Sequence, residues 1–90
     1  MLFMTIFTYK PEKRNEVIKR RLEKGPMIPR GMKVIGEWSD IGGGRVFRLV
    51  QVEDSAAAIT AAGAWSDLGR YEIVPVLDSE EALKHPLVGA

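Results

Sequence analysis

The sequence predicts a small α+β domain whose elements follow the order β-α-β-β-α-β. Four segments rich in Ile, Val, Phe and Tyr are interrupted by two segments of helical character. The expected strands carry apolar side chains on both faces, yet a chain of 90 residues supplies only two helices long enough to cover one face of their sheet. The other face therefore needs a partner, most simply a second copy of the chain.

The bulk composition indicates one ordinary globular domain covering residues 1–90. Hydrophobic residues make up 46% and charged residues 28%, which argues against a disordered or membrane chain. A formal net charge of +1 argues against a nucleic-acid partner. The absence of Cys excludes a disulfide framework and a thiolate metal site, and no other metal site is predicted. The apolar run 1–9 has no basic leader, no cleavage site and too few residues to span a bilayer, so we expect a cytoplasmic protein with no membrane partner.

The first strand and the first helix are predicted over residues 2–9 and 11–24. Residues 2–9 place Phe, Ile, Thr and Tyr on both faces, which is typical of a central strand. Pro11 suits the first turn of a helix, where its missing N–H costs nothing, and Gly25-Pro26 ends that helix. The helix carries a narrow apolar stripe made by Val17, Ile18 and Leu22.

Residues 32–40 and 45–52 flank an Ile-Gly-Gly-Gly connection and predict an antiparallel hairpin. A register symmetric about this connection places Trp38 opposite Phe47 and Glu37 opposite Arg48. Such a cross-strand Glu/Arg pair contributes roughly 0.2 to 1 kcal/mol. In this register one face carries Met32, Val34, Trp38, Phe47 and Leu49, and the other carries Ile35, Val46, Val50 and Val52 around the Glu37/Arg48 pair.

A second helix is predicted from Asp54 or Ser55, either of which can cap it, through the alanine-rich residues 56–62. The small alanine side chains allow this helix to lie close to the sheet. Residues 65–69 then form a return loop, in which Asp67 is expected to cap nearby backbone N–H groups.

The fourth strand is predicted over residues 70–77, at a sheet edge or at a bulge, because Pro75 cannot donate to a ladder. Asp78 and Glu81 have capping-box spacing for a short helix that Pro86 ends, within the C-terminal segment 79–90. With right-handed crossovers these elements form the ferredoxin-like plan, an antiparallel sheet of order 4-1-3-2 with both helices on one face. The fourth strand then falls at an edge, as Pro75 requires.

Several segments of the chain are shared with a known family. The most specific is Trp65-Ser66-Asp67-Leu68 followed by Glu72-Ile73-Val74-Pro75-Val76, and weaker ones are Tyr9-Lys10-Pro11, Pro29-x-Gly31, Trp38 and Phe47-x-Leu49 before Glu53-Asp54. Over about residues 1–84 the chain thereby resembles a small bacterial family known only as a domain of unknown function, number 3303.

The resemblance implies a homodimer of the dimeric α/β-barrel type, in which two ferredoxin-like sheets face each other with their helices outside. This superfamily also holds cofactor-independent monooxygenases, haem proteins similar to chlorite dismutase, muconolactone isomerases and stress-responsive barrels. The family supplies no established activity, catalytic residue or cofactor to carry over to this chain.

Three ionisable strand residues, Glu37, Arg48 and Glu72, are expected to point into a covered space, where charges occur paired. As a functional set they would line a barrel cavity, with Arg48 holding an anionic or carbonyl group and Glu72 acting as acceptor or base. As a structural set they would form an ion-pair network at the dimer seam or at the barrel rim. Their spacing fixes no reaction, so catalytic residues are left unassigned and the question of enzyme activity stays open.

The two tryptophans are candidate walls of an apolar ligand pocket. Core packing is the expectation for Trp38, opposite Phe47. Trp65 lies on a loop beside a strand end, where rigid scaffolds often carry binding residues. The candidate ligand-binding residues are therefore Glu37, Trp38, Arg48, Trp65 and Glu72.

The other conspicuous features have ordinary explanations. The triple glycine 42–44 precedes a strand and not a helix N-terminus, which favours a hairpin turn over a phosphate cradle. The basic stretch 10–24 indicates a solvated helix face, and residues 45–50 lack the glycine and the repeated aromatics of an RNA recognition motif. His85, the single histidine, lies in a tail beside Pro86, which disfavours a general base and a haem ligand, so no cofactor is predicted.

Three functions are compatible with these patterns. The first is an uncharacterised homodimeric barrel that binds a small apolar or aromatic molecule in its interior, with no catalysis assigned. The second is an enzyme resembling cofactor-independent monooxygenases or isomerases, and the third is a protein-interaction module that pairs with other chains through its sheet. A closed cavity holding polar groups favours the first two, and a solidly packed interior favours the third.

Overall fold

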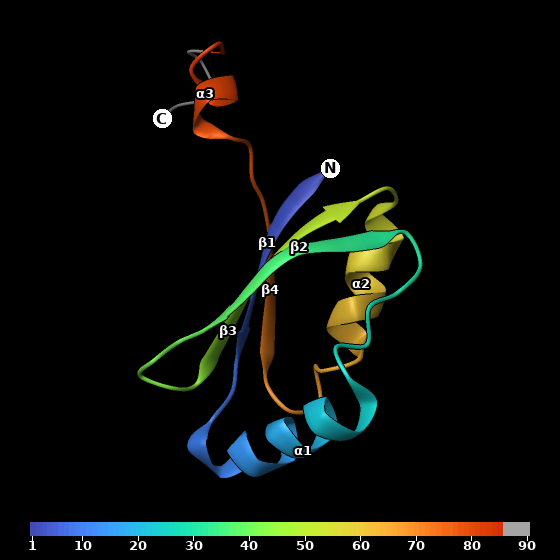
Figure 1. The fold of residues 1–90 in the computed structure, drawn as a ribbon, viewed down its shortest axis with the longest axis vertical. Helices are drawn as coiled ribbons and strands as arrows, with labels where there is room; N and C mark the ends of the chain where they lie inside the picture. Colours follow the sequence, from blue (N-terminus) through green and yellow to red (C-terminus); the bar gives the residue numbers. More distant parts are fainter. Residues whose placement is uncertain (86–90) are drawn as a thin grey trace.

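The computed structural model describes residues 1–85, which form a four-stranded antiparallel sheet with its main helices on one side (Figure 1). The strands are β1 (Leu2–Thr8), β2 (Met32–Ser39), β3 (Arg45–Val52) and β4 (Arg70–Pro75). A 3-10 turn, η1 (Pro11–Lys13), leads into α1 (Arg14–Lys24), whereas α2 (Ser55–Gly63) follows β3 and the short α3 (Ser79–Ala82) follows β4. The sheet order β2-β3-β1-β4 is the predicted order read from the opposite edge, so the α+β class and the ferredoxin-like arrangement are confirmed.

The helix boundaries follow the signals in the sequence. Gly25 ends α1 with a φ of 70°, a conformation that glycine adopts without steric cost. The Asp54 carboxylate accepts a hydrogen bond from the Ala56 N–H at the start of α2, and Asp78 caps α3 in the same way. Pro75 lies in the edge strand β4, as its missing N–H predicts. The expected end of the last helix at Pro86 lies outside the described residues.

The β2–β3 hairpin has the predicted register beside its turn and loses it further away. Glu37 lies opposite Arg48 and Trp38 opposite Phe47, as expected. A bulge at Ile35 then shifts the register, so that Val34 pairs with Val50. One extra residue reverses the alternation of side chains, so Met32 and Val34 share the face of Glu37 and not that of Trp38. The predicted faces are therefore wrong for Met32, Val34 and Ile35.

The helices cover the sheet face that carries Phe3, Thr5 and Phe7. A cluster under α2 contains Phe3, Val50, Val52 and Ala57, and a second cluster contains Phe7, Val17, Trp65 and Leu68. Three alanines of α2 are buried, so this helix packs closely against the strands. In α1 only Val17 is buried, and this helix lies across one end of the sheet (Figure 1). The covered face is thus sealed tightly by α2 and loosely by α1.

The opposite sheet face has no covering element within residues 1–85. Apolar side chains of β1, β3 and β4 lie next to one another on this face. They are Met4, Ile6, Phe47, Leu49 and Val74. Trp38 lies on this face with 53% of its surface exposed, and its ring occupies the space that a Cβ of Gly36 would take. Core packing of Trp38 is therefore wrong for the single subunit. We call this surface the open face.

Beyond β4 the chain leaves the body of the molecule and forms α3. Figure 1 shows α3 past the end of the sheet, well separated from α1 and α2. The apolar residues that flank α3 are largely exposed, Leu77 at 54% and Leu83 at 67%.

Candidate functional site

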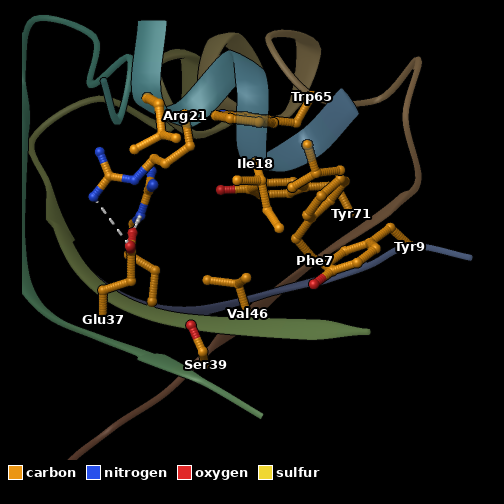
Figure 2. Close-up of a pocket in the computed structure, with 12 residues that line it drawn as sticks. Phe7, Tyr9, Ile18, Arg21, Glu37, Ser39, Val46, Trp65 and Tyr71 are labelled. Atoms are coloured by element: carbon orange, nitrogen blue, oxygen red, sulfur yellow. Dashed lines mark hydrogen bonds and ion pairs between the residues drawn. The ribbon is translucent and has the colours of Figure 1, made fainter. Parts of the chain in front are cut away.

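A cavity of about 220 Å³ lies between α1 and the covered face of the sheet. Figure 2 shows it as a space bounded by the helix above and by β3 below. The walls divide into a charged end and an aromatic end. The lining residues are Phe7, Tyr9, Val17, Ile18, Arg21, Leu22, Glu37, Ser39, Val46, Arg48, Trp65 and Tyr71.

The charged end is built by one carboxylate between two guanidinium groups. Arg48 Nε donates to Glu37 Oε2 at 2.7 Å, and Arg21 Nη2 donates to Glu37 Oε1 at 3.2 Å. Arg48 comes from the central strand β3, and its side chain is 8% exposed, whereas the Glu37 side chain is 26% exposed. Buried charges of this kind are tolerated only when they are paired. Glu37 therefore holds both arginines at one end of the cavity.

Three rings cluster around Phe7 at the aromatic end. The ring centroids of Tyr9, Trp65 and Tyr71 lie 5.8, 5.8 and 6.0 Å from that of Phe7, all tilted. Tilted aromatic pairs at these distances each add about 0.5 to 1.5 kcal/mol beyond their buried area. In Figure 2 the side chains of Ile18 and Val46 lie between the rings of Phe7 and Tyr9 and the Arg21–Glu37 pair. An occupant can thus touch rings at one end and charges at the other.

The position of Trp65 is fixed by a contact that the sequence did not indicate. Arg20 of α1 donates to both carboxylate oxygens of Asp67 at 2.7 Å and to the Ala64 carbonyl at 2.8 Å, and its guanidinium lies 5.6 Å from the Trp65 ring centre. These hydrogen bonds from Arg20 lower the pKa of Asp67 below its ordinary value of 3.8. Asp67 therefore ties α1 to the return loop. The expected capping of local backbone N–H groups is not its main role.

The Trp65 indole Nε1 is buried without a hydrogen-bond partner in residues 1–85. A buried N–H left without a partner typically costs about 1 to 3 kcal/mol. The packing of the ring against Phe7 and under Arg20 offsets this cost. Trp65 thus lines the cavity although its buried, unpaired indole N–H lowers the stability of the fold.

Two apolar side chains of α1 stay exposed where they line the cavity. Ile18 is 38% and Leu22 is 81% exposed, although both belong to the predicted apolar stripe of the helix. Only Val17, the third member of the stripe, packs into the core. The cavity is open to solvent on the side of Ile18 and Leu22, and its rim is apolar.

Three of the five predicted site residues line this cavity and two do not. Glu37, Arg48 and Trp65 lie together between α1 and the sheet. Glu72 pairs with Ile6 across β1 and β4, which places it on the open face near Arg70. Trp38 is on the open face as well. The expectation that Glu72 shares a covered space with Glu37 and Arg48 is therefore wrong, because Glu72 and Arg48 lie on opposite faces of the sheet.

The sequence reasoning missed Arg21, Tyr9, Phe7 and Tyr71 as cavity residues. The signal for Arg21 is its position four residues after Val17 and three after Ile18, within the apolar stripe. Residues spaced in this way share one helix face, so a basic residue there faces the covered side of the sheet. The rings of Phe7 and Tyr71 are cross-strand neighbours, a pairing that needs the β1–β4 register.

The remaining candidates of the sequence lie outside this cavity. His85 is exposed, and residues 1–85 hold no group of three His, Cys, Asp or Glu side chains placed to bind a metal ion. The glycine segment 42–44 forms a turn closed by the Gly43 N–H and the Asp40 carbonyl at 2.8 Å. In the same part of the chain, no helix is long and apolar enough to cross a membrane.

Fold and site together define a small ferredoxin-like α+β domain with an aromatic and partly charged cavity beneath its first helix. The family model of the domain of unknown function DUF3303 matches residues 1–86, so the chain belongs to this family. The resemblance drawn from the Trp65 and Glu72 segments is thereby confirmed. Comparisons with curated proteins and with solved structures gave no match.

Proposed function

We propose that this protein binds a small molecule with an aromatic or apolar body in the cavity beneath α1. The supporting observation is the cavity itself, in which apolar and aromatic walls meet one charged end. Small-molecule sites usually have this composition, with volumes of roughly 300 to 1,000 Å³. At about 220 Å³ the cavity lies below that range, so it suits a correspondingly small ligand.

The exposed side chains of α1 support the same proposal. A ligand in the cavity would cover parts of Ile18 and Leu22 that now face solvent. Removal of apolar surface from water contributes about 25 cal/mol per Å². The binding energy would thus come from surface that the fold leaves uncovered.

The geometry favours binding over proton abstraction. Glu37, the one carboxylate that lines the cavity, accepts hydrogen bonds from Arg48 and Arg21 on its two oxygens. A general base needs an oxygen within hydrogen-bond reach of the proton that it removes. The two arginines compete for both oxygens, so the carboxylate acts as a positioning group for them.

Ligand-observed NMR with a set of monocyclic aromatic compounds tests the binding role. The variant Val46→Phe fills the cavity, whereas Ile59→Phe adds the same ring to an exposed position of α2, where Ile59 is 70% exposed. We expect binding to the wild type and to Ile59→Phe and its loss in Val46→Phe, with circular dichroism as the check on folding. Equal binding to a folded Val46→Phe variant would contradict the proposal.

We further propose that two copies of the chain pair through the open face. The proposal is supported by its continuous apolar centre, which includes Met4, Phe47 and Leu49, and by Trp38 at 53% exposure. Arg45, the first residue of β3, lies with its guanidinium carbon 5.2 Å from the centre of the Phe47 ring. A large exposed apolar patch of this kind marks an interaction surface, and a specific dimer buries about 1,200 to 2,000 Å².

Sedimentation velocity at micromolar concentration tests the pairing. Leu49→Asp places a charge at the centre of the open face, and Ile59→Asp places the same charge on α2, away from that face. We expect a dimer for the wild type and for Ile59→Asp, and a folded monomer for Leu49→Asp. A stable, folded monomer of the wild type would overturn the proposal.

A further inference from the structure

We propose that the cavity ligand is a small monocarboxylate, held by Arg48 and Arg21 through its carboxylate and by the aromatic rings through an apolar body. This inference rests on the binding role proposed above and names the chemical class of the ligand. It comes from the charged end of the cavity, whose arginines the proposed binding of an apolar molecule does not require.

Arg48 has hydrogen-bond donors that the described part of the protein does not use. Its side chain is 8% exposed, and within residues 1–85 its one side-chain hydrogen bond runs from Nε to Glu37. The two terminal nitrogens are left with four N–H groups for another acceptor. Within residues 1–85, the one fully buried side-chain nitrogen or oxygen without a hydrogen-bond partner is Trp65 Nε1. The two terminal nitrogens of Arg48 are therefore not fully buried. Arg48 therefore offers the end of its guanidinium to the cavity that it lines.

The geometry of a guanidinium selects the partner. Its two terminal nitrogens point in parallel, and a carboxylate accepts both N–H groups at once through its two oxygens. Such charge-assisted pairs are roughly twice as strong as neutral hydrogen bonds. A carbonyl or hydroxyl group can accept from only part of this donor set.

The net charge of the site points to a single negative charge on the ligand. The charged lining residues are Arg21, Arg48 and Glu37, which leaves one positive charge unbalanced. Arg48, with its side chain 8% exposed, carries the more buried of the two positive charges, and a bound monoanion would neutralise the excess charge. A neutral ligand would leave the charge in place, and a dianion would reverse its sign.

The second arginine comes from the helix that borders the open side of the cavity. Arg21 is 43% exposed and is held by Glu37 Oε1 at 3.2 Å, a longer contact than that of Arg48. This looser side chain can turn toward a carboxylate bound at Arg48 without breaking the Glu37–Arg48 pair. Arg21 thus serves as a movable second donor.

The rest of the ligand follows from the shape of the site. Figure 2 shows Ile18 and Val46 between the Arg21–Glu37 pair and the rings of Phe7 and Tyr9. The cavity volume is about 220 Å³. A single ring or a short hydrocarbon chain next to one carboxylate fits both the volume and the two different ends.

Isothermal titration with phenylacetate and phenylacetamide tests the inference, because these probes share a ring and differ in charge. We expect phenylacetate to bind at least about tenfold more tightly than phenylacetamide. Arg48→Met should remove this preference, and Arg48→Lys should keep part of it. Arg30→Met is the matched control at an exposed loop arginine and should bind both probes as the wild type does.

Glu37→Gln provides a readout that a merely structural role would not give. The amide oxygen still accepts a hydrogen bond, while the negative charge that competes with the ligand is gone. We expect the affinity for phenylacetate to rise about threefold or more, although the variant is less stable. A fall in affinity in both Glu37→Gln and Arg48→Met would overturn the inference.

The remaining outcomes separate the two proposals. Equal affinities for phenylacetate and phenylacetamide would overturn the carboxylate class and leave the binding role of the cavity standing. Inorganic phosphate that binds as tightly as phenylacetate would also overturn it, because the apolar body would then contribute nothing. Failure of both aromatic probes to bind at millimolar concentration would overturn the inference together with the proposed function.

Discussion

Arg48 and Glu37 face each other across the β2–β3 hairpin, with Arg48 Nε 2.7 Å from Glu37 Oε2, at the border between the packed core and the cavity. On one side of Arg48 along β3 lies Val50, which is fully buried, and on the other side lies Val46 in the cavity wall. The pair thus marks the point where the covered face of the sheet changes from tight packing to open space.

Loss of the Glu37 carboxylate should destabilise the protein, because it leaves the buried charge of Arg48 without its partner. Breaking a fully buried pair costs about 3 to 5 kcal/mol, and the partial exposure of Glu37 lowers the expectation for Glu37→Ala to about 2 kcal/mol. Urea unfolding measures this change, with Glu53→Ala at an exposed position as the control. Equal unfolding free energies for the two variants would show that Arg48 needs no partner.

Asp67→Asn should change how stability depends on pH. Arg20 lowers the pKa of Asp67 from 3.8 in the folded protein, so the ion pair stabilises the fold at neutral pH. This stabilisation is lost as the pH falls through the lowered pKa, because the carboxyl group is then protonated in both states.

The unfolding free energies of wild type and Asp67→Asn should therefore differ at neutral pH and converge in acid. The difference at neutral pH should be modest, because the Asp67 side chain is 60% exposed. Urea titrations across this pH range measure the difference. A constant difference at all pH values would mean that the charge of Asp67 does not carry its contribution.

Gly69→Ala and Gly63→Ala should change stability in opposite directions. A Cβ at Gly69 would collide with the Thr8 carbonyl oxygen and with the Phe7 ring, so the return loop could no longer lie against the end of β1. We expect a loss of about 1 to 3 kcal/mol. A Cβ at Gly63, in the last turn of α2, meets nothing within 4 Å, so alanine there should stabilise by about 0.5 to 1 kcal/mol. A Gly69→Ala variant that melts at or above the melting temperature of the wild type would contradict the close approach of the loop to β1.

Substitutions at Leu22 and Val17 should separate ligand binding from stability. Leu22 is 81% exposed at the cavity, so Leu22→Ser should leave the unfolding free energy within about 0.5 kcal/mol of the wild type and weaken binding of phenylacetate. Val17 is 7% exposed, and Val17→Ala should cost about 1 to 3 kcal/mol. Calorimetry and ligand titration on the same samples test both. Unchanged binding in Leu22→Ser would show that the rim of the cavity does not touch the ligand.

Local patterns in the sequence predict the elements and part of the hairpin register. The Glu37–Arg48 and Trp38–Phe47 pairs follow from the glycine turn, because a tight turn sets the register of the residues beside it. The bulge at Ile35 moves Met32 and Val34 to the covered face, and its local signal is the neighbouring Gly36, since a glycine inside a strand often marks a bulge. Pairing rules therefore hold only as far as the first irregularity in the strand.

The cavity depends on tertiary packing that single-element patterns do not contain. The stripe of α1 predicts that Val17, Ile18 and Leu22 face the sheet, but it does not tell how close the helix comes to it. The Arg20–Asp67 pair between α1 and the return loop helps to set this distance. Charge alone groups Glu72 with Arg48, but the registers of β1 with β3 and β4 put the two on opposite faces.

A proton–nitrogen NMR titration with phenylacetate tests occupancy of the cavity most directly, because the chain contains 2 tryptophans and they lie on opposite faces of the sheet. Trp65 lines the cavity, and Trp38 is on the open face. We predict that the indole N–H signal of Trp65 shifts with ligand concentration, together with the Nε–H signal of Arg48, while that of Trp38 stays in place. A shift of the Trp38 signal alone, or no shift in either indole, would contradict a binding site beneath α1.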